Sequence, residues 1–382
     1  MIRSIIVIVF ITFFIGTAVA SERPTDAQLH AYKVVHHAEY LKTTAAQAGG
    51  TNKLIHTTKL PTEGTDPVVT PALDHLYTKA VIDLTSGPVV LEIPEVSKDR
   101  YFSIHITDQE HYTIYDEVRP LGKYVFIRKG KNIKVPEGAK AIESPGDYPH
   151  LFIRTQLFSE DDKPNVIAIQ KQIKLTGVRK TLKFDNAIKF TLNTHDIYPQ
   201  NKGILASVMD YCVEDHKKVF DFMTKLGETG KIKSNIGLFG PIDSDEPHSN
   251  DPVYRASAIV GHLGLPAKHA IYIPRFINCQ GVPLNGDNTE VFTLPYEPPN
   301  VKEFWSITRY SAITRNTLPG KNDVFNAYNT QPDKNGNIII TFSSKDPKDG
   351  SYWMPVNAGD PYYYVIRYYG TDLNNLPPDA CD

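Results

Sequence analysis

Three segments rich in aromatic residues follow one another in the C-terminal part of the chain. They read FWSIT at 304–308, YWMP at 352–355 and YYYVIRYYG at 362–370. Aromatic and β-branched side chains fit the pleated, half-buried surface of a sheet. The segments therefore predict a C-terminal body built from β-strands, and they hold both tryptophans of the chain.

The whole chain favours short strands joined by tight turns, since it has 28 prolines and 24 glycines but only four methionines. Strands are expected at 79–84, 89–93, 101–107, 124–128, 151–157, 270–273, 292–294, 304–310 and 338–342. Helices are expected at 28–47, 204–226 and 253–262, and a loop at 231–250. This pattern predicts a β-rich (α+β) fold. Two β-sandwich or jelly-roll-like domains, at 21–200 and 267–382, are expected to be joined by a helical segment at 201–266.

Residues 1–20 have the layout of a secretory signal peptide. Arg3 precedes an apolar run at 5–14, and the small-residue site AVA at 18–20 precedes Ser21. This layout predicts cleavage after residue 20 and export to the periplasm or the medium. The alternative is an uncleaved anchor, but the run is shorter than the roughly 20 residues of a spanning helix. No later segment has the length and apolarity to span, so no membrane association is expected after cleavage.

Charge and motifs exclude several classes of protein. The formal net charge of −2 leaves no basic surface for nucleic acid, which is excluded as a partner. Cys212, Cys279 and Cys381 allow at most one disulfide, and the sequence leaves its pairing open. Their spacing fits neither a zinc site nor a redox Cys-x-x-Cys motif. Nucleophile-elbow, dinucleotide and Walker motifs are missing from the sequence, so no metal and no cofactor is predicted.

Short motifs in both halves of the chain resemble those of one group of proteins. In the N-terminal half they are Asp74, Tyr77, DLTSGPVVL at 83–91, RYFS at 100–103 and Asp108. In the C-terminal half they are GVPLNG at 281–286, FWSIT at 304–308, WMP at 353–355 and RYYG at 367–370. With these motifs the chain resembles exported bacterial proteins that join the domains of unknown function 1254 and 1214. The resemblance implies a β-rich two-domain body with a jelly-roll-like C-terminal part and an unassigned activity.

The chain departs from the pattern of that group at two places. It reads ALDHLY at 72–77, where relatives tend to carry a run like NNDTLY. After the Phe-Trp pair, relatives commonly have an apolar residue, Tyr and Asp, whereas this chain has Arg309, Tyr310 and Ser311. A role that depends on those asparagines or on that aspartate is therefore not expected here.

The segment at 101–108 offers candidate catalytic groups. It alternates, so that Tyr101 and His105 share the polar face of a strand with a serine and a threonine. His105 is a candidate acid or base because an imidazole changes its charge near neutral pH. Asp108 or Asp74 would supply the carboxylate, with Tyr77 or Tyr101 assisting. The alternative is a solvated polar face, as is also expected of His36, His37, His216 and His248.

Arginine and aromatic side chains in the C-terminal strands are candidates for ligand binding. Arg309 shares strand parity with Trp305, and guanidinium beside indole suits stacking or the binding of an acid. Trp353, Arg367 and Tyr101 complete the candidate set. The alternative for both arginines is a structural ion pair or cation–π contact.

These residues favour an exported protein that binds a small organic or saccharide ligand in a cleft lined by aromatics and Arg309 near the domain junction. The arginines favour an anionic ligand. One alternative is a hydrolase or lyase that uses His105 with a carboxylate. Another is an envelope assembly protein whose tyrosines form a homo-oligomer interface.

Overall fold

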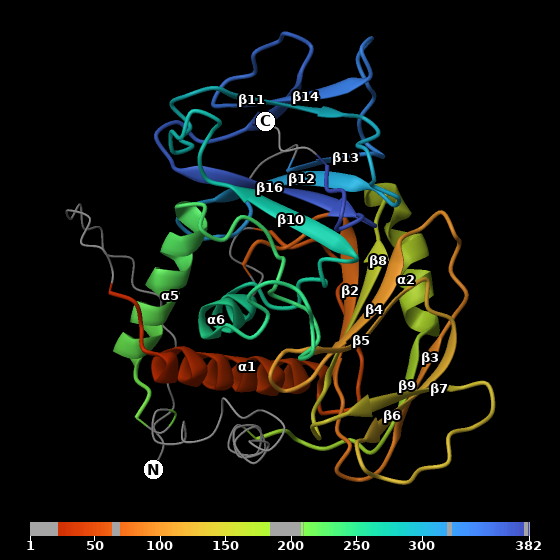
Figure 1. Cartoon of the computed structure of the whole chain (residues 1–382). Helices are drawn as coiled ribbons and strands as arrows, with labels where there is room; N and C mark the ends of the chain where they lie inside the picture. The colour runs from red at the N-terminus through yellow and green to blue at the C-terminus, as the bar shows by residue number, and fades with distance from the viewer. Residues whose placement is uncertain are drawn as a thin grey trace.

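The computed structural model describes residues 22–62, 69–183, 208, 210–318, 323–377 and 381. The predicted signal peptide at 1–20 lies outside these residues and stays a prediction. Within the described residues, 16 strands form four sheets, and the chain has the β-rich, two-sandwich fold that the sequence predicts. The two sandwiches and a group of helices surround a common centre (Figure 1).

The N-terminal sandwich consists of two sheets. The sheet that faces the rest of the molecule, called the inner N-terminal sheet, has the order β1-β2-β8-β4-β5. Its strands are β1 (Ile55–His56), β2 (His75–Val81), β8 (His150–Gln156), β4 (Phe102–Thr107) and β5 (Thr113–Val118). The other sheet consists of β7 (Lys140–Ser144), β6 (Gly122–Arg128), β3 (Val89–Ile93) and β9 (Lys174–Thr176).

Alternation along β4 explains how the two sheets pack. Phe102, Ile104 and Ile106 point into the apolar core between the sheets, where they meet residues of β3 and β6. Ser103 and His105 lie on the opposite face and are also buried. The predicted alternation is confirmed, but its polar face is covered by the rest of the molecule instead of by solvent.

The C-terminal sandwich repeats this arrangement. Its inner sheet consists of β10 (Ala270–Arg275), β16 (Tyr362–Tyr369), β12 (Trp305–Ser311) and β13 (Val324–Asn326). Its outer sheet consists of β11 (Glu290–Pro295), β14 (Asn337–Ser343) and β15 (Tyr352–Pro355). Trp305, Ile307, Tyr364 and Ile366 belong to the core between these sheets. Residues of odd number in β16 therefore face the N-terminal sandwich.

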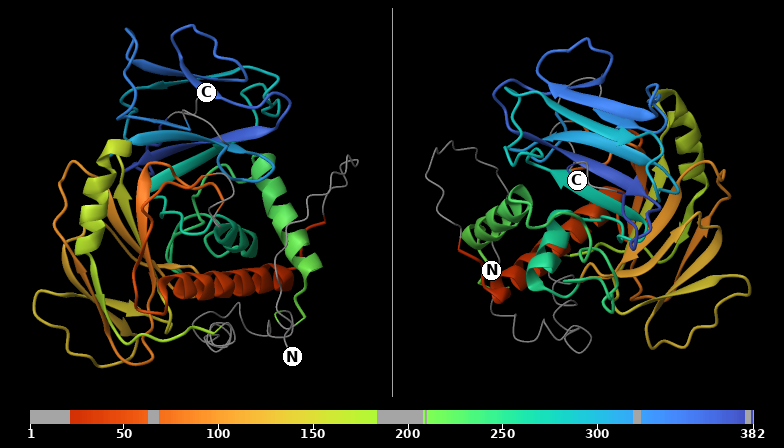
Figure 2. Two further views of the ribbon diagram at one scale, coloured as in Figure 1. Left: turned by 180° about the vertical axis from the view of Figure 1, so that it is seen from behind. Right: turned by 45° about the horizontal axis from the view of Figure 1, so that its top comes forward.

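Three helices fill the angle between the sandwiches, as the views in Figure 2 show. Helix α1 (Asp26–Ala48) begins with a capping box at Thr25 and ends at Gly49, whose φ of 77° is left-handed. It packs against β2 on one side and against α5 (Val213–Glu228) and α6 (Pro252–Val260) on the other. A fourth helix, α2 (Lys163–Gln172), follows the short 3₁₀ turn η1 (Glu160–Asp162) and packs on the N-terminal sandwich.

The sequence located most elements but missed some. Strand β5 was not predicted, because only one of its six residues is buried and its pattern is not apolar. The helix expected at 204–226 is α5, which begins at Val213, and residues 204–207 and 209 of that prediction lie outside the described residues. None of the helices in the described part of the chain has the length and apolarity needed to cross a membrane.

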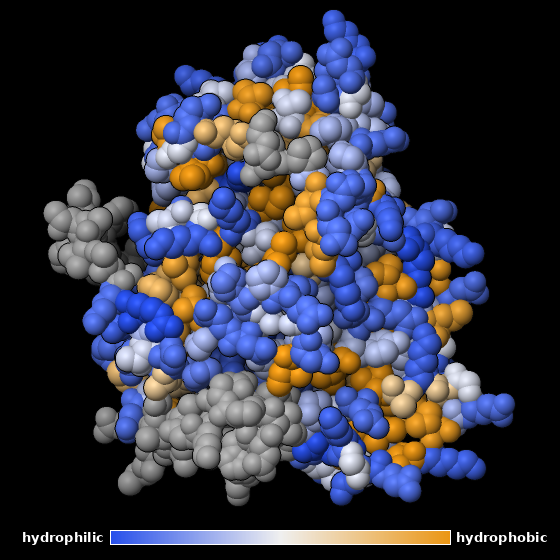
Figure 3. Space-filling model, in the orientation of Figure 1, coloured by the Kyte–Doolittle hydropathy of each residue, from blue (hydrophilic) through white to orange (hydrophobic). Residues whose placement is uncertain are grey.

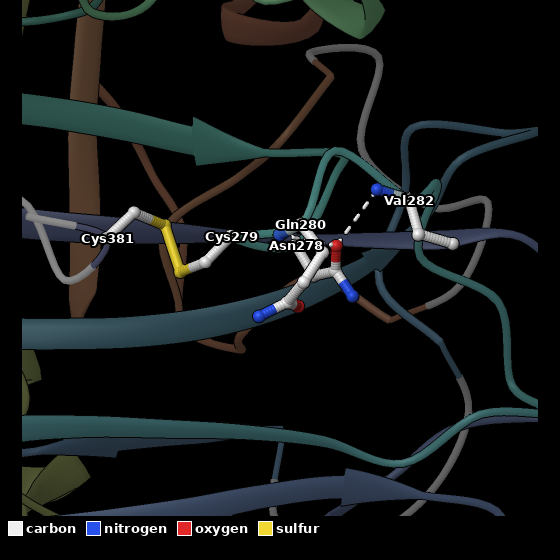
Figure 4. Close-up of a disulfide and its surroundings, with 5 residues drawn as sticks. All are labelled: Asn278, Cys279, Gln280, Val282 and Cys381. Carbon is white, nitrogen blue, oxygen red and sulfur yellow. Dashed lines mark hydrogen bonds between the residues drawn. A yellow bond between two sulfur atoms is a disulfide. The ribbon is translucent and has the colours of Figure 1, made fainter.

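A disulfide joins Cys279, after β10, to Cys381 (Figure 4), and Cys212 is an exposed free thiol. The sequence had left this pairing open. The bridge closes a loop with a sequence separation of 102 residues, which lowers the entropy of the unfolded chain. Such bridges persist in oxidising compartments.

We expect loss of this bridge to lower the free energy of unfolding by about 2–4 kcal/mol. Urea unfolding of the Cys279→Ala/Cys381→Ala variant against the wild type measures the change. Cys212→Ala is the matched control and should unfold like the wild type. A double variant as stable as the wild type would contradict the expected role of the bridge.

Candidate functional site

A cavity of about 270 Å³ lies where the two inner sheets meet the helices. Strands β2 and β8 line it from the N-terminal sandwich, and β10 and β16 line it from the C-terminal sandwich. One face of α5 and the segment after α6 complete the wall. Both sandwiches therefore contribute to a single cavity, as the sequence analysis expected of a domain junction.

Aromatic and aliphatic side chains form most of the wall. Tyr77 and Phe152 stack face to face, with their ring centroids 4.8 Å apart. On the C-terminal side, Phe276 stacks on Tyr363 at 4.3 Å. Such surfaces suit an apolar or aromatic ligand, because they hold most of the contact area in rigid rings.

The charges in the wall are all of one sign. Four basic residues line the cavity, and none of the described lining residues is acidic. The four are Lys79, Arg154, Arg315 and Arg367. Since the whole chain has a formal net charge of −2, this local excess of positive charge is not a reflection of composition.

Arg154 lies on β8, the central strand of the inner N-terminal sheet, between Tyr77 and Ser103 on the neighbouring strands. Its side chain is buried, and its guanidinium packs over the Phe152 ring at 4.7 Å. Nη2 donates a hydrogen bond to the carbonyl of Leu263, whereas Nη1 is buried without a hydrogen-bond partner. None of the described carboxylates forms an ion pair with it. A buried cation in this state is costly, which marks Arg154 as a candidate binding group.

Arg367 lines the same cavity from β16 and is buried. It donates to the carbonyl of Thr70 and to the Tyr310 hydroxyl, both at 2.9 Å. Burial alone would lower the pKa of Arg367, but the nearby Tyr310, Tyr369 and Asp74 raise it above its usual value. Arg367 is therefore held as a cation by its own partners, unlike Arg154.

The structure does not bring Arg309, Trp305 and Trp353 to the cavity. Arg309 and Trp305 lie on the face of β12 that packs against the outer sheet, and Arg309 is bonded there to Asp323 at 2.9 Å and to the carbonyl of Pro355. Trp353 belongs to β15 of that outer sheet. The cleft expected around Arg309 is therefore corrected to one around Arg154 and Arg367, because the covered face of β12 is the one that carries Arg309.

His105 and Asp108 also lie away from the cavity wall. The Thr113 hydroxyl donates its proton to the carbonyl of Phe239. Nε2 of His105 lies 2.7 Å from Thr113 Oγ1 and is therefore the donor of the bond between His105 and Thr113. Burial, with a smaller contribution from the nearby Arg154, lowers the pKa of His105 to about 3. Asp108 accepts hydrogen bonds from the backbone N–H groups of Glu110 and Tyr112, which closes the turn after β4. Both residues have structural contacts in this arrangement.

The remaining candidates lie closer to the cavity. Tyr77 lines it, as described above. Tyr101 packs against Phe304 and against Tyr369, which lines the cavity. Burial raises the pKa of Tyr101. Asp74 pairs with His75 at 2.5 Å. Burial would raise the pKa of Asp74, but His75 and Arg367 bring it down to about 2.

His36 and His37, which were expected in solvent, lie in a histidine cluster beside the cavity, whereas His248 is exposed as expected. Nδ1 of His37 lies 3.2 Å from Nε2 of His262, which lines the cavity, and His111 accepts a bond from the N–H of Leu263. Burial lowers the pKa of His36 to about 4 and that of His37 to about 3. The prediction of solvated histidines on this helix is wrong, because α1 is covered on both sides. No group of three possible ligands among the described residues has the geometry of a metal site.

Sequence reasoning missed Arg154, although a signal was present. In HLFIRTQ at 150–156, Leu151 and Ile153 point into the core, so His150, Phe152 and Arg154 share the other face. An arginine on the same face as an aromatic, in a strand of otherwise apolar character, is the pattern that singled out Arg309. The same pattern, applied to the strand at 150–156, identifies Arg154 as a candidate binding residue.

Figure 3 shows a largely hydrophilic face with apolar residues in separate patches. The large exposed apolar residues include Leu121, Val213, Val291 and Ile313, which lie on different elements. The predicted homo-oligomer therefore stays a prediction.

Comparison with known proteins gives two families and a fold. Residues 51–177 match the family described as "Protein of unknown function (DUF1254)", and residues 269–373 match "Protein of unknown function (DUF1214)". The VPA0106 protein from Vibrio parahaemolyticus has a similar structure, with a TM-score of 0.66 at 20% identity over 91% of this chain and 94% of that one. A Burkholderia cenocepacia protein described as uncharacterised has a TM-score of 0.47 at 12% identity, over 89% and 84%. The curated proteins contain no match.

The two matched regions meet at the cavity. Tyr77 and Arg154 lie in the first region, and Tyr363 and Arg367 lie in the second. Helices α5 and α6, which close the wall, lie between the two regions. The cavity is therefore a product of the tandem arrangement.

Proposed function

We propose that the protein binds a small organic ligand in the cavity between the region that matches the DUF1254 model and the region that matches the DUF1214 model. The observation that carries this proposal is the aromatic wall, to which both domains contribute. A cavity built jointly by two domains and lined by rings is the usual form of a small-molecule site.

The size of the cavity limits the ligand. An engineered apolar cavity of about 150 Å³ binds benzene, so about 270 Å³ suits a molecule with one or two rings or a short alkyl chain. A longer saccharide fits less well, because most of the exposed wall is apolar.

We expect the uncharged two-ring dye 6-propionyl-2-dimethylaminonaphthalene to bind at one saturable site with increased, blue-shifted fluorescence. Thr224 lies half-buried on the cavity face of α5, and Thr224→Phe places a ring in the wall, which should weaken dye binding at least about tenfold. Lys225→Phe adds the same ring to the same helix outside the wall and should leave binding unchanged. Fluorescence titration gives all three affinities.

Native mass spectrometry of the purified protein provides an independent readout. A stoichiometric mass that is lost on denaturation would identify a retained ligand. Failure of the dye to bind, or equal binding by Thr224→Phe and the wild type, would contradict the proposal. The hydrolase or lyase and the assembly protein stay predictions.

A further inference from the structure

Building on the proposed function, we infer that the ligand is an amphipathic carboxylic acid whose carboxylate is anchored by Arg154 and whose apolar body packs on the aromatic wall. The inference depends on the charge of the cavity, on the state of Arg154 and on the character of the wall. Each of these points to a different part of the ligand.

The sign of the charge follows from the lining residues. Four cations and no described carboxylate surround the cavity, and low-polarity walls strengthen their combined potential. Arg315 is bonded to Glu228 at 2.8 Å, and Arg367 lies near Asp74. Arg154 is the arginine of this set that lacks a nearby acid. An anion in the cavity would therefore be attracted chiefly to Arg154.

The anchor atom follows from the hydrogen bonds. Arg154 is only 5% exposed, and Nη1 is left without an acceptor while Nη2 is held by Leu263. The Nη2 bond and the Phe152 ring fix the plane of the guanidinium. Nη1 is closed to solvent in this structure, so an oxyanion would reach this fixed, unused donor after a small shift of the wall.

The class of acid follows from the small number of unused donors. A phosphate monoester carries close to two charges and three acceptor oxygens, and sites for it need several donors. Among the described lining residues, Arg154 is the buried guanidinium with an unused donor, and one such donor in a mainly apolar wall suits a single carboxylate with an apolar body. The ligand class is therefore an aryl or alkyl carboxylic acid.

The test compares acids with their uncharged amides, which have nearly the same shape. Benzoate and benzamide, 2-naphthoate and 2-naphthamide, and octanoate and octanamide compete at pH 7 with the bound dye. For at least one pair, the acid should bind about 10- to 100-fold more tightly than the amide, as a charge-assisted hydrogen bond predicts. Arg154→Met should remove this preference while retaining affinity for the amide.

Two further variants keep the test decisive. Arg128→Met removes a half-buried guanidinium of β6, remote from the cavity wall, and should keep the full preference. Arg154→Lys keeps the charge but loses the planar fork, so it should reduce the preference for the acid. It replaces Arg154→Met as the test if the methionine variant does not fold. Circular dichroism establishes that each variant is folded.

The outcomes separate the two proposals. Acids and amides that displace the dye equally, or a preference that survives in Arg154→Met, would overturn the carboxylate inference and leave the cavity as a site for neutral ligands. Failure of the dye and of every acid and amide to bind would overturn the proposed function itself, and this inference with it.

Discussion

Acidification from pH 7 to about pH 4.5 is expected to unfold the protein cooperatively, because six histidines are buried in neutral form. They are His30, His37, His105, His111, His150 and His262. Burial is the largest cause of the lowered pKa in each, and Lys33, Arg154 and Arg255 oppose protonation of some of them.

The direction follows from proton uptake by the two states. In the unfolded chain a histidine has a pKa of about 6.5, whereas His37 and His105 in the fold have a pKa of about 3. The stabilisation is fully present above pH 6.5 and is lost as the pH falls from there towards the folded values, since only the unfolded state takes up protons in that window. Each histidine contributes about 1.4 kcal/mol per pH unit, so several together exceed a typical stability of 5–15 kcal/mol.

Urea unfolding at pH 7, 6 and 5 measures this loss. His150 has no hydrogen-bond partner on either ring nitrogen, so His150→Phe should flatten the pH dependence by about 1.4 kcal/mol per unit. His248 is exposed and stacks on Tyr254, so His248→Phe is the matched control and should leave the slope unchanged. A wild-type stability that is equal at pH 7 and pH 5 would show that the buried histidines do not govern acid unfolding.

Local patterns were sufficient for most of the strands and for the parity of their side chains, although short or polar strands such as β5 were missed. Alternation correctly placed Phe102 and Ile104 on one face of β4, and it correctly separated Arg309 from Tyr310 on β12. The strand at 89–93 was predicted with its observed bounds. These features depend on neighbours one or two residues apart, and the sequence displays such neighbours directly.

Which face of a strand lines a site depends on distant parts of the chain. Arg309 and Arg367 lie on antiparallel neighbours, β12 and β16, but point to opposite sides of the sheet. The outer sheet covers one side and the N-terminal sandwich the other, and neither partner is visible in the local pattern. The same reason explains the histidines of α1. The surroundings of α1 include His111, His150 and His262, which pack on the helix from far along the chain.

Lys33→Met is expected to lower the free energy of unfolding by about 3–5 kcal/mol, because it leaves the buried Glu110 carboxylate without its cation. Lys33 on α1 and Glu110 in the turn after β4 are each 1% exposed and form an ion pair. The carbonyl of Glu110 also accepts a bond from Arg255 on α6 at 2.9 Å. Glu110 thus links α1, through Lys33, and α6, through Arg255, to the turn after β4.

A double-mutant cycle in urea separates the pair from the packing of its side chains. Glu110→Gln should cost a similar amount, since it leaves the Lys33 ammonium buried beside a neutral amide. Lys33→Met/Glu110→Leu removes both charges and should recover most of the loss, as buried ion pairs exchanged for apolar residues often do. Strictly additive single losses would mean that the two side chains act independently. Recovery in the double variant would mean that most of each single loss comes from the unpaired charge left buried in the fold.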